Sequence, residues 1–242
     1  MTLDERFEGD TLDETVWFPH YLPHWSSLEE SAADHQVRDG SLQLRISKDH
    51  PLWCPDLHGE PLRVSCIQSG NVPGSQPFRD HLEIRAPDTA FRGYLPFCGD
   101  IGVRMRGDVT SRSMFAFWLS GVEDEAHQSG EICVAEIFGS GIDADTAEVG
   151  IGLHSFRDPA LREDFHAERL RIDVSDFHEY GVVWRPGSLT FSIDGRLLRR
   201  IDQAPEYPVQ LMLGVFDFPD RAGDPDHEPR MWVERVWSHP LE

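Results

Sequence analysis

The feature that most constrains this sequence is an alternation of apolar and polar residues with a period of two. In residues 41–47 (SLQLRIS), Leu42, Leu44 and Ile46 alternate with polar neighbours. The same alternation recurs at residues 101–105, 189–193 and 211–215. A period of two places one set of side chains on the core face of a β-strand and the other set on the opposite face. The pattern therefore predicts an all-β protein.

The residues between these segments indicate tight turns and few helices. Asp194-Gly195 follows one strand segment directly and is a strong hairpin signal. Residues 158–165 (DPALREDF) predict roughly two helical turns, with proline at the first helical position. Residues 173–180 predict one further turn. Many short strands with turn signals between them favour a β-sandwich or jelly roll, and we expect residues 1–242 to form a single domain.

Two of the expected strands carry an unusual second face. Within residues 113–121 that face includes Ala116 and Trp118, and within residues 147–154 it includes Gly150, Gly152 and His154. Small residues leave room above a sheet, and a tryptophan offers a flat surface to a sugar ring. We interpret this face as a binding groove; the alternative is a sandwich whose second face is covered by a loop.

The charge of the chain excludes two classes of partner. Its formal net charge is −21, from 43 acidic and 22 basic residues. Such a surface repels phosphate backbones and anionic lipids, so we expect no nucleic acid and no membrane partner.

The first ten residues lack the basic and apolar regions of a signal peptide, and no apolar run approaches the roughly 20 residues that span a bilayer. We expect a cytoplasmic monomer, or a secreted protein if a leader has been removed.

The four cysteines do not follow a metal-binding pattern. Cys54, Cys66, Cys98 and Cys133 include no C-x-x-C pair. Cys54 and Cys66 flank an expected hairpin loop and could form a disulfide. Free thiols are the alternative, which the absence of a leader favours.

The most informative stretch is residues 131–139 (EICVAEIFG). In a flat strand, Glu131 and Glu136 would point to opposite faces, because they are an odd number of residues apart. A β-bulge near Val134 or Ala135 would add one residue and bring both glutamates to the same face. Without the bulge, Glu136 would place an unpaired carboxylate in the core, which is very costly. The sequence therefore predicts a bulge and a pair of carboxylates in the groove.

Two carboxylates on one groove face suit the hydrolysis of glycosidic bonds. At a separation of about 5–5.5 Å, one carboxylate attacks the anomeric carbon while the other protonates the leaving oxygen and then activates water. The product keeps the configuration of the substrate. An E-x4-E pattern alone does not identify such an enzyme, since paired glutamates on strands are often exposed charges.

The stretch GEICVAEIFG resembles the active-site strand of glycoside hydrolase family 16, of the bulged E-x-D-x-x-E type found in laminarinases and other endo-β-1,3-glucanases. Other segments resemble the family in the same order along the chain. They are FEGDTLDETVW (7–17), SMFAFWLSG (113–121), GIGLHSF (150–156), DFHEYGVVWRPGSLTFSIDG (176–195) and RMWVERVW (230–237). The resemblance covers nearly the whole chain.

The resemblance implies a fold and a set of catalytic residues. The fold is a concanavalin A-like β-jelly roll, in which two curved antiparallel sheets form a sandwich with a concave substrate groove. Glu131 would be the nucleophile and Glu136 the acid/base. The chain departs from the family's pattern at Cys133, which takes the position of the aspartate that assists the nucleophile. This departure predicts a slow enzyme.

The resemblance also implies which residues bind the substrate. Trp118 would stack on the sugar at the cleavage point, His154 would lie near Glu136, and Arg104 would line the cleft. Trp25 is a further cleft candidate. Plain packing is the alternative for Trp118 and His154.

The expected activity is endo-acting, retaining hydrolysis of a β-glucan, with β-1,3 linkages as the first candidate. The alternatives are a transglycosylase, which uses the same carboxylates, and a lectin-like domain without catalysis. No cofactor is required. Some family members carry a structural calcium on the convex side, and Glu5 and Glu234 are the candidate ligands here.

Overall fold

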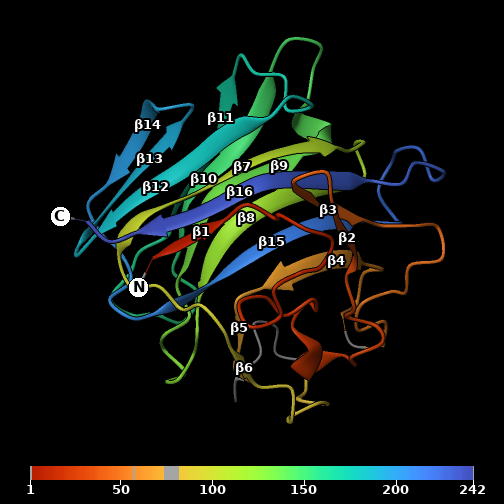
Figure 1. The fold of residues 1–242 in the computed structure, drawn as a ribbon, viewed down its shortest axis with the longest axis horizontal. Helices are drawn as coiled ribbons and strands as arrows, with labels where there is room; N and C mark the ends of the chain where they lie inside the picture. The colour runs from red at the N-terminus through yellow and green to blue at the C-terminus, as the bar shows by residue number, and fades with distance from the viewer. Residues whose placement is uncertain (1, 57, 74–81, 242) are drawn as a thin grey trace.

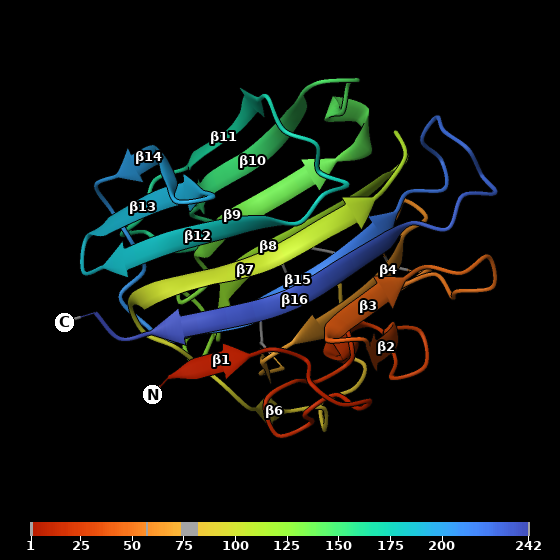
Figure 2. The ribbon, with the colours of Figure 1, turned by 45° about the horizontal axis from the view of Figure 1, so that its top comes forward.

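Two antiparallel sheets pack face to face in the computed structural model, which describes residues 2–56, 58–73 and 82–241 (Figures 1 and 2). Every strand pairing recorded within these ranges is antiparallel. The same ranges contain two short 3-10 helices, η1 (Pro23–Trp25) and η2 (Gly139–Gly141), and no α-helix. The predicted all-β jelly-roll sandwich is confirmed.

The larger sheet has eight strands. They are β1 (Leu3–Glu5), β2 (Asp34–Arg38), β3 (Ser41–Arg45), β7 (Gly99–Asp108), β12 (His178–Arg185), β13 (Ser188–Ile193), β14 (Arg196–Ile201) and β16 (Arg230–His239). Their order across the sheet is β14-β13-β12-β7-β16-β3-β2, and β1 also pairs with β16. The first and last strands of the chain therefore lie side by side (Figure 2).

The smaller sheet has six strands and carries the candidate site. They are β4 (Arg63–Gln68), β8 (Ser113–Gly121), β9 (Glu131–Phe138), β10 (Ala147–His154), β11 (Asp164–Leu170) and β15 (Val209–Asp217). Their order is β11-β10-β9-β8-β15-β4, so β9 lies inside the sheet with a partner on each side. A separate pair joins β5 (Gly70–Asn71) and β6 (Phe91–Arg92).

The main core lies between the two sheets and contains the apolar members of the alternating segments. Leu42 and Leu44 of β3 and Phe115 and Phe117 of β8 are fully buried there. The hairpin expected after residue 193 joins β13 to β14, and Asp194 and Gly195 both have positive φ angles, of 49° and 72°. Positive φ at both central residues is the signature of the two-residue turn that matches strand twist.

A second apolar cluster lies on the opposite face of the smaller sheet. Trp25, Trp53 and Cys54, from segments that precede β4, pack there with Met114 and Trp118 of β8. Loops therefore cover part of this face, as the alternative interpretation held, and the cleft described below occupies the part beside β9. Because one face packs on the main core and the other packs on these loops, the smaller sheet is apolar on both faces.

The two cysteines considered for a disulfide are free thiols. Cys54 and Cys66 are both buried, and neither is bonded to another cysteine. The Cys54 thiol donates to the carbonyl oxygen of Trp25 at 3.0 Å. The free-thiol alternative is confirmed.

The expected helical turns at residues 158–165 are absent. The Asp158 side chain accepts hydrogen bonds from the Ala160 N–H at 2.8 Å and from the Tyr207 hydroxyl at 2.7 Å, which holds a turn there. Residues 164–170 then extend as β11, because the backbone of β10 offers them a ladder of hydrogen bonds. Residues 173–180 make a turn and enter β12. Pairing with the sheet overrides the local helical preference.

In the part of the chain that the structure describes, no helix has the length and apolar character needed to cross a bilayer.

Candidate active site

A β-bulge in β9 sets the geometry of the site. Across the pairing with β8, Phe117 lies opposite Ala135 and Trp118 lies opposite Cys133, so Val134 has no partner of its own. The pairing of β9 with β10 shifts at the same place. One extra residue resets the alternation of the side chains. The bulge that the sequence predicts is therefore present at Val134.

The bulge sorts the side chains of β9 between the two faces of the sheet. The core between the sheets receives Ile132, Val134, Ala135 and Ile137. Cys133 belongs to the cluster on the opposite face, and Glu131 and Glu136 line the cavity on that face. Both carboxylates thus reach one cleft, as the sequence predicts.

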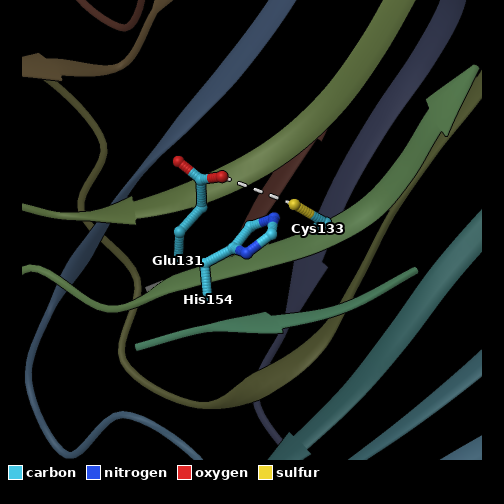
Figure 3. A group of neighbouring side chains, drawn as sticks. All are labelled: Glu131, Cys133 and His154. Atoms are coloured by element: carbon cyan, nitrogen blue, oxygen red, sulfur yellow. Dashed lines mark hydrogen bonds between the residues drawn. The ribbon is translucent and has the colours of Figure 1, made fainter. Parts of the chain in front are cut away.

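The Cys133 thiol lies between the two carboxyl groups. It donates to Glu131 Oε1 at 3.4 Å and contacts Glu136 Oε2 at 3.9 Å (Figure 3 shows the first contact). Because both oxygens contact one sulfur atom, they are no more than about 7 Å apart, which includes the roughly 5–5.5 Å of retaining glycosidases.

Burial is the main cause of the pKa shifts of Glu131, Glu136 and Cys133. Burial raises the pKa of Glu131 above its ordinary 4.5, His154 and the Cys133 hydrogen bond lower it, and nearby Glu136 adds to the rise, so that the pKa lies at about 7. Burial also raises the pKa of Glu136. Burial, reinforced by the two carboxylates, raises the pKa of the Cys133 thiol well above 9, so the thiol is neutral at pH 7.

His154 lies across from the first glutamate. The strand register places it opposite Glu131, whereas Gly150 lies opposite Glu136. Its Nδ1 is 2.5 Å from Glu163 Oε1, and the other oxygen of Glu163 accepts the Ser155 N–H at 3.2 Å. Glu163 was not apparent from the sequence, because nothing local relates a residue of the loop before β11 to a histidine at the end of β10.

The cleft beside these residues has a cavity of about 260 Å³. Trp118 and Trp25 line it, as the resemblance implies, and both are largely buried. Gly214 leaves room for the Trp118 ring, since a Cβ there would lie 3.3 Å from Trp118 Cη2. Further lining residues that the sequence did not reveal are Tyr21, Phe156, Gln210, Met212 and Phe216. The alternation within residues 209–216 places the last three on the face of Trp118 and could have identified them.

The glycines of β10 do not leave space for a ligand. A Cβ at Gly150 would lie 2.5 Å from Phe165 Cζ, and one at Gly152 would lie 2.3 Å from the carbonyl oxygen of Asp164. Phe165 also stacks on His154, with ring centroids 4.6 Å apart. The interpretation of these glycines as room for a sugar is therefore wrong: they allow β11 and its phenylalanine to lie close to β10.

Arg104 does not line the cleft. It lies on β7 of the larger sheet, between Val103 and Met105, which point into the core. Arg104 therefore points to the outer face, where its Nε donates to Glu234 Oε2 at 2.7 Å. The expectation for Arg104, which the resemblance implied, is wrong, because β7 belongs to the larger sheet and the outer face of that sheet lies away from the cleft.

One group of potential metal ligands occurs among the described residues. It consists of Glu131, Cys133 and His154, whose ligand atoms lie within 4.8 Å of one another. Glu5 accepts a hydrogen bond from the Phe7 N–H at 2.7 Å. The calcium site expected at Glu5 and Glu234 stays a prediction.

A buried hydrogen-bond network holds the beginning of β9. The Gly130 N–H donates to the Tyr207 hydroxyl at 2.8 Å, and that hydroxyl donates to Asp158 at 2.7 Å. Gly130 directly precedes Glu131, and a Cβ at Gly130 would lie 2.7 Å from the Tyr207 oxygen. These contacts fix the backbone from which Glu131 enters the cleft.

A pair of partly buried carboxyl groups in a cleft on a β-sandwich is the arrangement of enzymes that hydrolyse glycosidic bonds. A sequence model described as "Glycosyl hydrolases family 16" matches residues 93–234, more than half of the chain. The chain therefore belongs to glycoside hydrolase family 16, and the resemblance noted from the motifs is confirmed.

Known proteins similar to this chain act on different glycans. The curated Glucan endo-1,3-beta-glucosidase A1 of Niallia circulans is 23% identical over 217 residues, which are 84% of this chain and 29% of that protein. The solved GlcNAcα1-4Gal releasing endo-β-galactosidase from Clostridium perfringens is 26% identical with a TM-score of 0.83, covering 97% of this chain and 62% of that chain. This chain thus spans less than a third of the first and less than two thirds of the second.

A laminarinase from Flavobacterium sp. UMI-01 has the same fold. Its solved structure superposes with a TM-score of 0.68 at 17% identity, and the match covers 98% of both chains.

Proposed function

We propose that this chain is an endo-acting glycoside hydrolase that cleaves β-linked glycans with retention of configuration. The observation that carries the proposal is the bulge at Val134, which brings Glu131 and Glu136 into one cleft on either side of Cys133. An arrangement that served packing alone would have no reason to hold two carboxyl groups in a partly buried site, where burial raises the pKa of each.

In the proposed reaction, Glu131 and Glu136 act in turn. The ionised Glu131 attacks the anomeric carbon, and Glu136 gives its proton to the leaving glycosidic oxygen. Glu136 then takes a proton from water, whose oxygen displaces Glu131 from the anomeric carbon. Trp118 supports the sugar at the cleavage point through its flat ring.

The roles of Glu131 as nucleophile and Glu136 as acid/base follow from their positions in the family's E-x-D-x-x-E motif. The pKa shifts do not distinguish the roles, since burial raises the pKa of both glutamates. Glu131→Ala with added azide tests the assignment, because azide can attack from the side that the missing carboxylate leaves open. A glycosyl azide of inverted configuration supports Glu131 as the nucleophile; the same product from Glu136→Ala and none from Glu131→Ala would contradict it.

The first candidate substrate is a β-1,3-glucan, as the curated relative and the laminarinase suggest. The assay is release of reducing sugar from laminarin, with lichenan and xyloglucan as controls for linkage. The configuration of the first product, followed by proton NMR before mutarotation, tests retention. No release from laminarin by the wild-type chain would contradict the glucan as substrate. Release that Glu131→Gln and Glu136→Gln both retain would contradict the proposed site.

The second candidate substrate is a β-galactoside within a longer glycan. The superposition on the endo-β-galactosidase, with a TM-score of 0.83 against 0.68 for the laminarinase, favours it. The test uses glycans that end in GlcNAcα1-4Gal, and the readout is release of that disaccharide. Its release without cleavage of laminarin would select this substrate over the glucan.

Two further activities would use the same cleft. A transglycosylase would transfer the glycosyl group from Glu131 to a sugar, so products longer than the substrate would reveal it. A lectin-like domain would bind the glycan without cleaving it, which calorimetry with intact oligosaccharides would detect.

A further inference from the structure

Three chemically different ligand groups converge beside the cleft, and one of them, Glu131, lines it. A carboxylate oxygen of Glu131, the sulfur of Cys133 and a ring nitrogen of His154 all lie within 4.8 Å of one another. Two of the residues lie on β9 and the third lies on the adjacent strand β10. Figure 3 shows the three side chains directed toward a common space above the sheet.

We propose that Glu131, Cys133 and His154 bind Zn²⁺ or another thiophilic divalent cation, and that the bound ion blocks the cleft. Zn²⁺ takes thiolate, imidazole and carboxylate ligands at about 2.0–2.3 Å in tetrahedral geometry. The 3.4 Å between Cys133 Sγ and Glu131 Oε1 matches the edge between two ligands of such an ion. A fourth position remains for water.

His154 is already held as a metal ligand would be. Its Nδ1 is 2.5 Å from Glu163 Oε1, and Glu163 is itself anchored by the Ser155 N–H. A carboxylate that holds one ring nitrogen fixes the orientation of the ring and leaves the other nitrogen for the metal. A ring nitrogen of His154 faces the Cys133 sulfur in Figure 3.

The charge around the three ligands favours a divalent cation. Glu136 lies 3.9 Å from the same sulfur, and Glu163 adds a third carboxyl group beside His154. Nearby arginines have other carboxylate partners: Arg157 pairs with Glu123, and Arg199 pairs with Asp164. A bound cation would offset this concentration of negative charge. When the metal–sulfur bond forms, the Cys133 thiol releases its proton to solvent.

Blocking of the cleft rests on the proposed function, whereas binding of the ion does not. The ion would hold the Glu131 oxygen that attacks the anomeric carbon. Zn²⁺ would therefore act as a reversible inhibitor, and a chelator would restore activity.

The binding test is a titration of the full chain with Zn²⁺ against a chromogenic chelator, followed by a titration with Co²⁺. We expect one ion per chain and, with Co²⁺, the absorption of a thiolate-to-metal charge transfer. Cys133→Ser and His154→Gln should each weaken binding at least about tenfold, and Cys133→Ser should abolish the thiolate band. Glu163→Gln should weaken binding about tenfold while the band remains, since Glu163 positions a ligand and is not one.

Cys98→Ser is the matched control. Cys98 is a partly buried free thiol beside a different cavity, and its replacement should leave Zn²⁺ affinity and hydrolysis as in the wild-type chain. Affinity weaker than millimolar in the wild-type chain, or equal affinity in Cys133→Ser, would overturn the metal site.

The activity test follows the glycan assay with increasing Zn²⁺. Loss of hydrolysis at one equivalent of bound ion, with recovery on adding a chelator, supports blocking of the cleft. Full hydrolysis with the ion bound would overturn it. A chain that binds one ion through Cys133 but cleaves none of the glycans would contradict the proposed function and leave the metal site supported.

Discussion

Glu131 places a carboxyl group in a partly buried cleft, where a charge is less well solvated than at the surface. Burial raises its pKa from 4.5 to about 7, so the folded chain holds this proton more tightly than the unfolded chain does. The stability that the proton gives is fully present below about pH 4.5 and is lost as the pH rises through about 7. Ionisation of Glu131, which the proposed reaction requires, therefore lowers the stability of the fold at neutral pH.

The first prediction is that Glu131→Gln abolishes turnover but stabilises the fold at high pH. Glutamine cannot ionise, so the variant avoids burying a charge. The free energy of unfolding of the variant, relative to wild type, should rise by up to about 3 kcal/mol between pH 4.5 and pH 8. Urea denaturation at both pH values measures this difference.

The control for this prediction is Glu179→Gln, which removes one acidic group from an exposed position on β12. Its stability relative to wild type should change little with pH. A difference for Glu131→Gln that is the same at both pH values would show that the Glu131 carboxylate is solvated.

The second prediction concerns Cys133, where the family's pattern has aspartate. A thiol is a weak donor, whereas a protonated carboxyl group donates a strong hydrogen bond to a carboxylate. In Cys133→Asp, that bond should stabilise the ionised form of Glu131. The acid limb of the kcat/KM profile should therefore move to lower pH, and kcat should rise about tenfold, which corresponds to about 1.4 kcal/mol.

Cys133→Asn separates ionisation from hydrogen bonding in this experiment, since asparagine matches aspartate in size and donates through its amide but does not ionise. An equal shift of the acid limb in both variants would assign the effect to a hydrogen-bond donor of this size and not to an ionisable group. An unaltered profile in Cys133→Asp would remove position 133 from the mechanism.

At the scale of elements, one unpaired residue in β9 decides whether the site exists. Val134 has no partner across either neighbouring strand, and its side chain lies in the core beside that of Ala135. Two consecutive residues face the core, which a regular strand does not allow. The bulge thus lets one strand supply both core packing and two carboxylates of the cleft.

The third prediction is that deletion of Val134 removes activity by changing the alternation of β9. Without the extra residue, either Glu136 turns into the core or the strand slips against its neighbours. An unpaired carboxylate in the core costs several kcal/mol. We expect no detectable turnover and a strongly lowered midpoint of thermal unfolding, measured by circular dichroism.

Val134→Ala is the matched variant, because it keeps the bulge and removes only methyl groups from the core. It should lose about 1–3 kcal/mol of stability and keep the pH profile of glycan cleavage. Wild-type activity in the deletion variant would show that the bulge does not position Glu136.

At the scale of the whole molecule, charge is the dominant feature. The 43 acidic residues outnumber the 22 basic residues. Many basic side chains are engaged in surface ion pairs, such as that of Arg104 with Glu234, and such pairs contribute little to stability. The remaining negative charges repel one another in the compact state more than in the expanded chain.

The fourth prediction is that NaCl stabilises this protein. Raising NaCl from about 0.01 M to about 0.5 M shortens the screening length several-fold, which weakens the repulsion between exposed carboxylates. The midpoint of thermal unfolding, measured by scanning calorimetry, should rise by a few degrees. Sucrose at equal osmolality controls for effects that do not depend on charge. A midpoint that falls with NaCl would show that ion pairs outweigh the repulsion.

Much of the fold and the centre of the site followed from local pattern. The alternation at Leu42 and Leu44 predicted strands, Asp194-Gly195 predicted a hairpin, and the spacing of Glu131 and Glu136 predicted the bulge between them. These features are local because a side chain's face depends on backbone geometry a few residues away. A carboxylate in the core is so costly that the sequence alone favoured a bulge over a regular strand at residues 131–136.

Tertiary structure decided which segments meet. Arg104 has the same alternation as a cleft residue would have, but β7 joins the larger sheet, so Arg104 pairs with Glu234 on the outer face. Residues 158–165 favour a helix locally and become a turn and a strand because the edge of β10 offers backbone partners. Glu163 reaches His154, and Tyr207 holds Gly130, only after the sheet has formed. A sequence determines the face of each strand through short-range geometry, whereas the order of strands depends on burial summed over the whole chain.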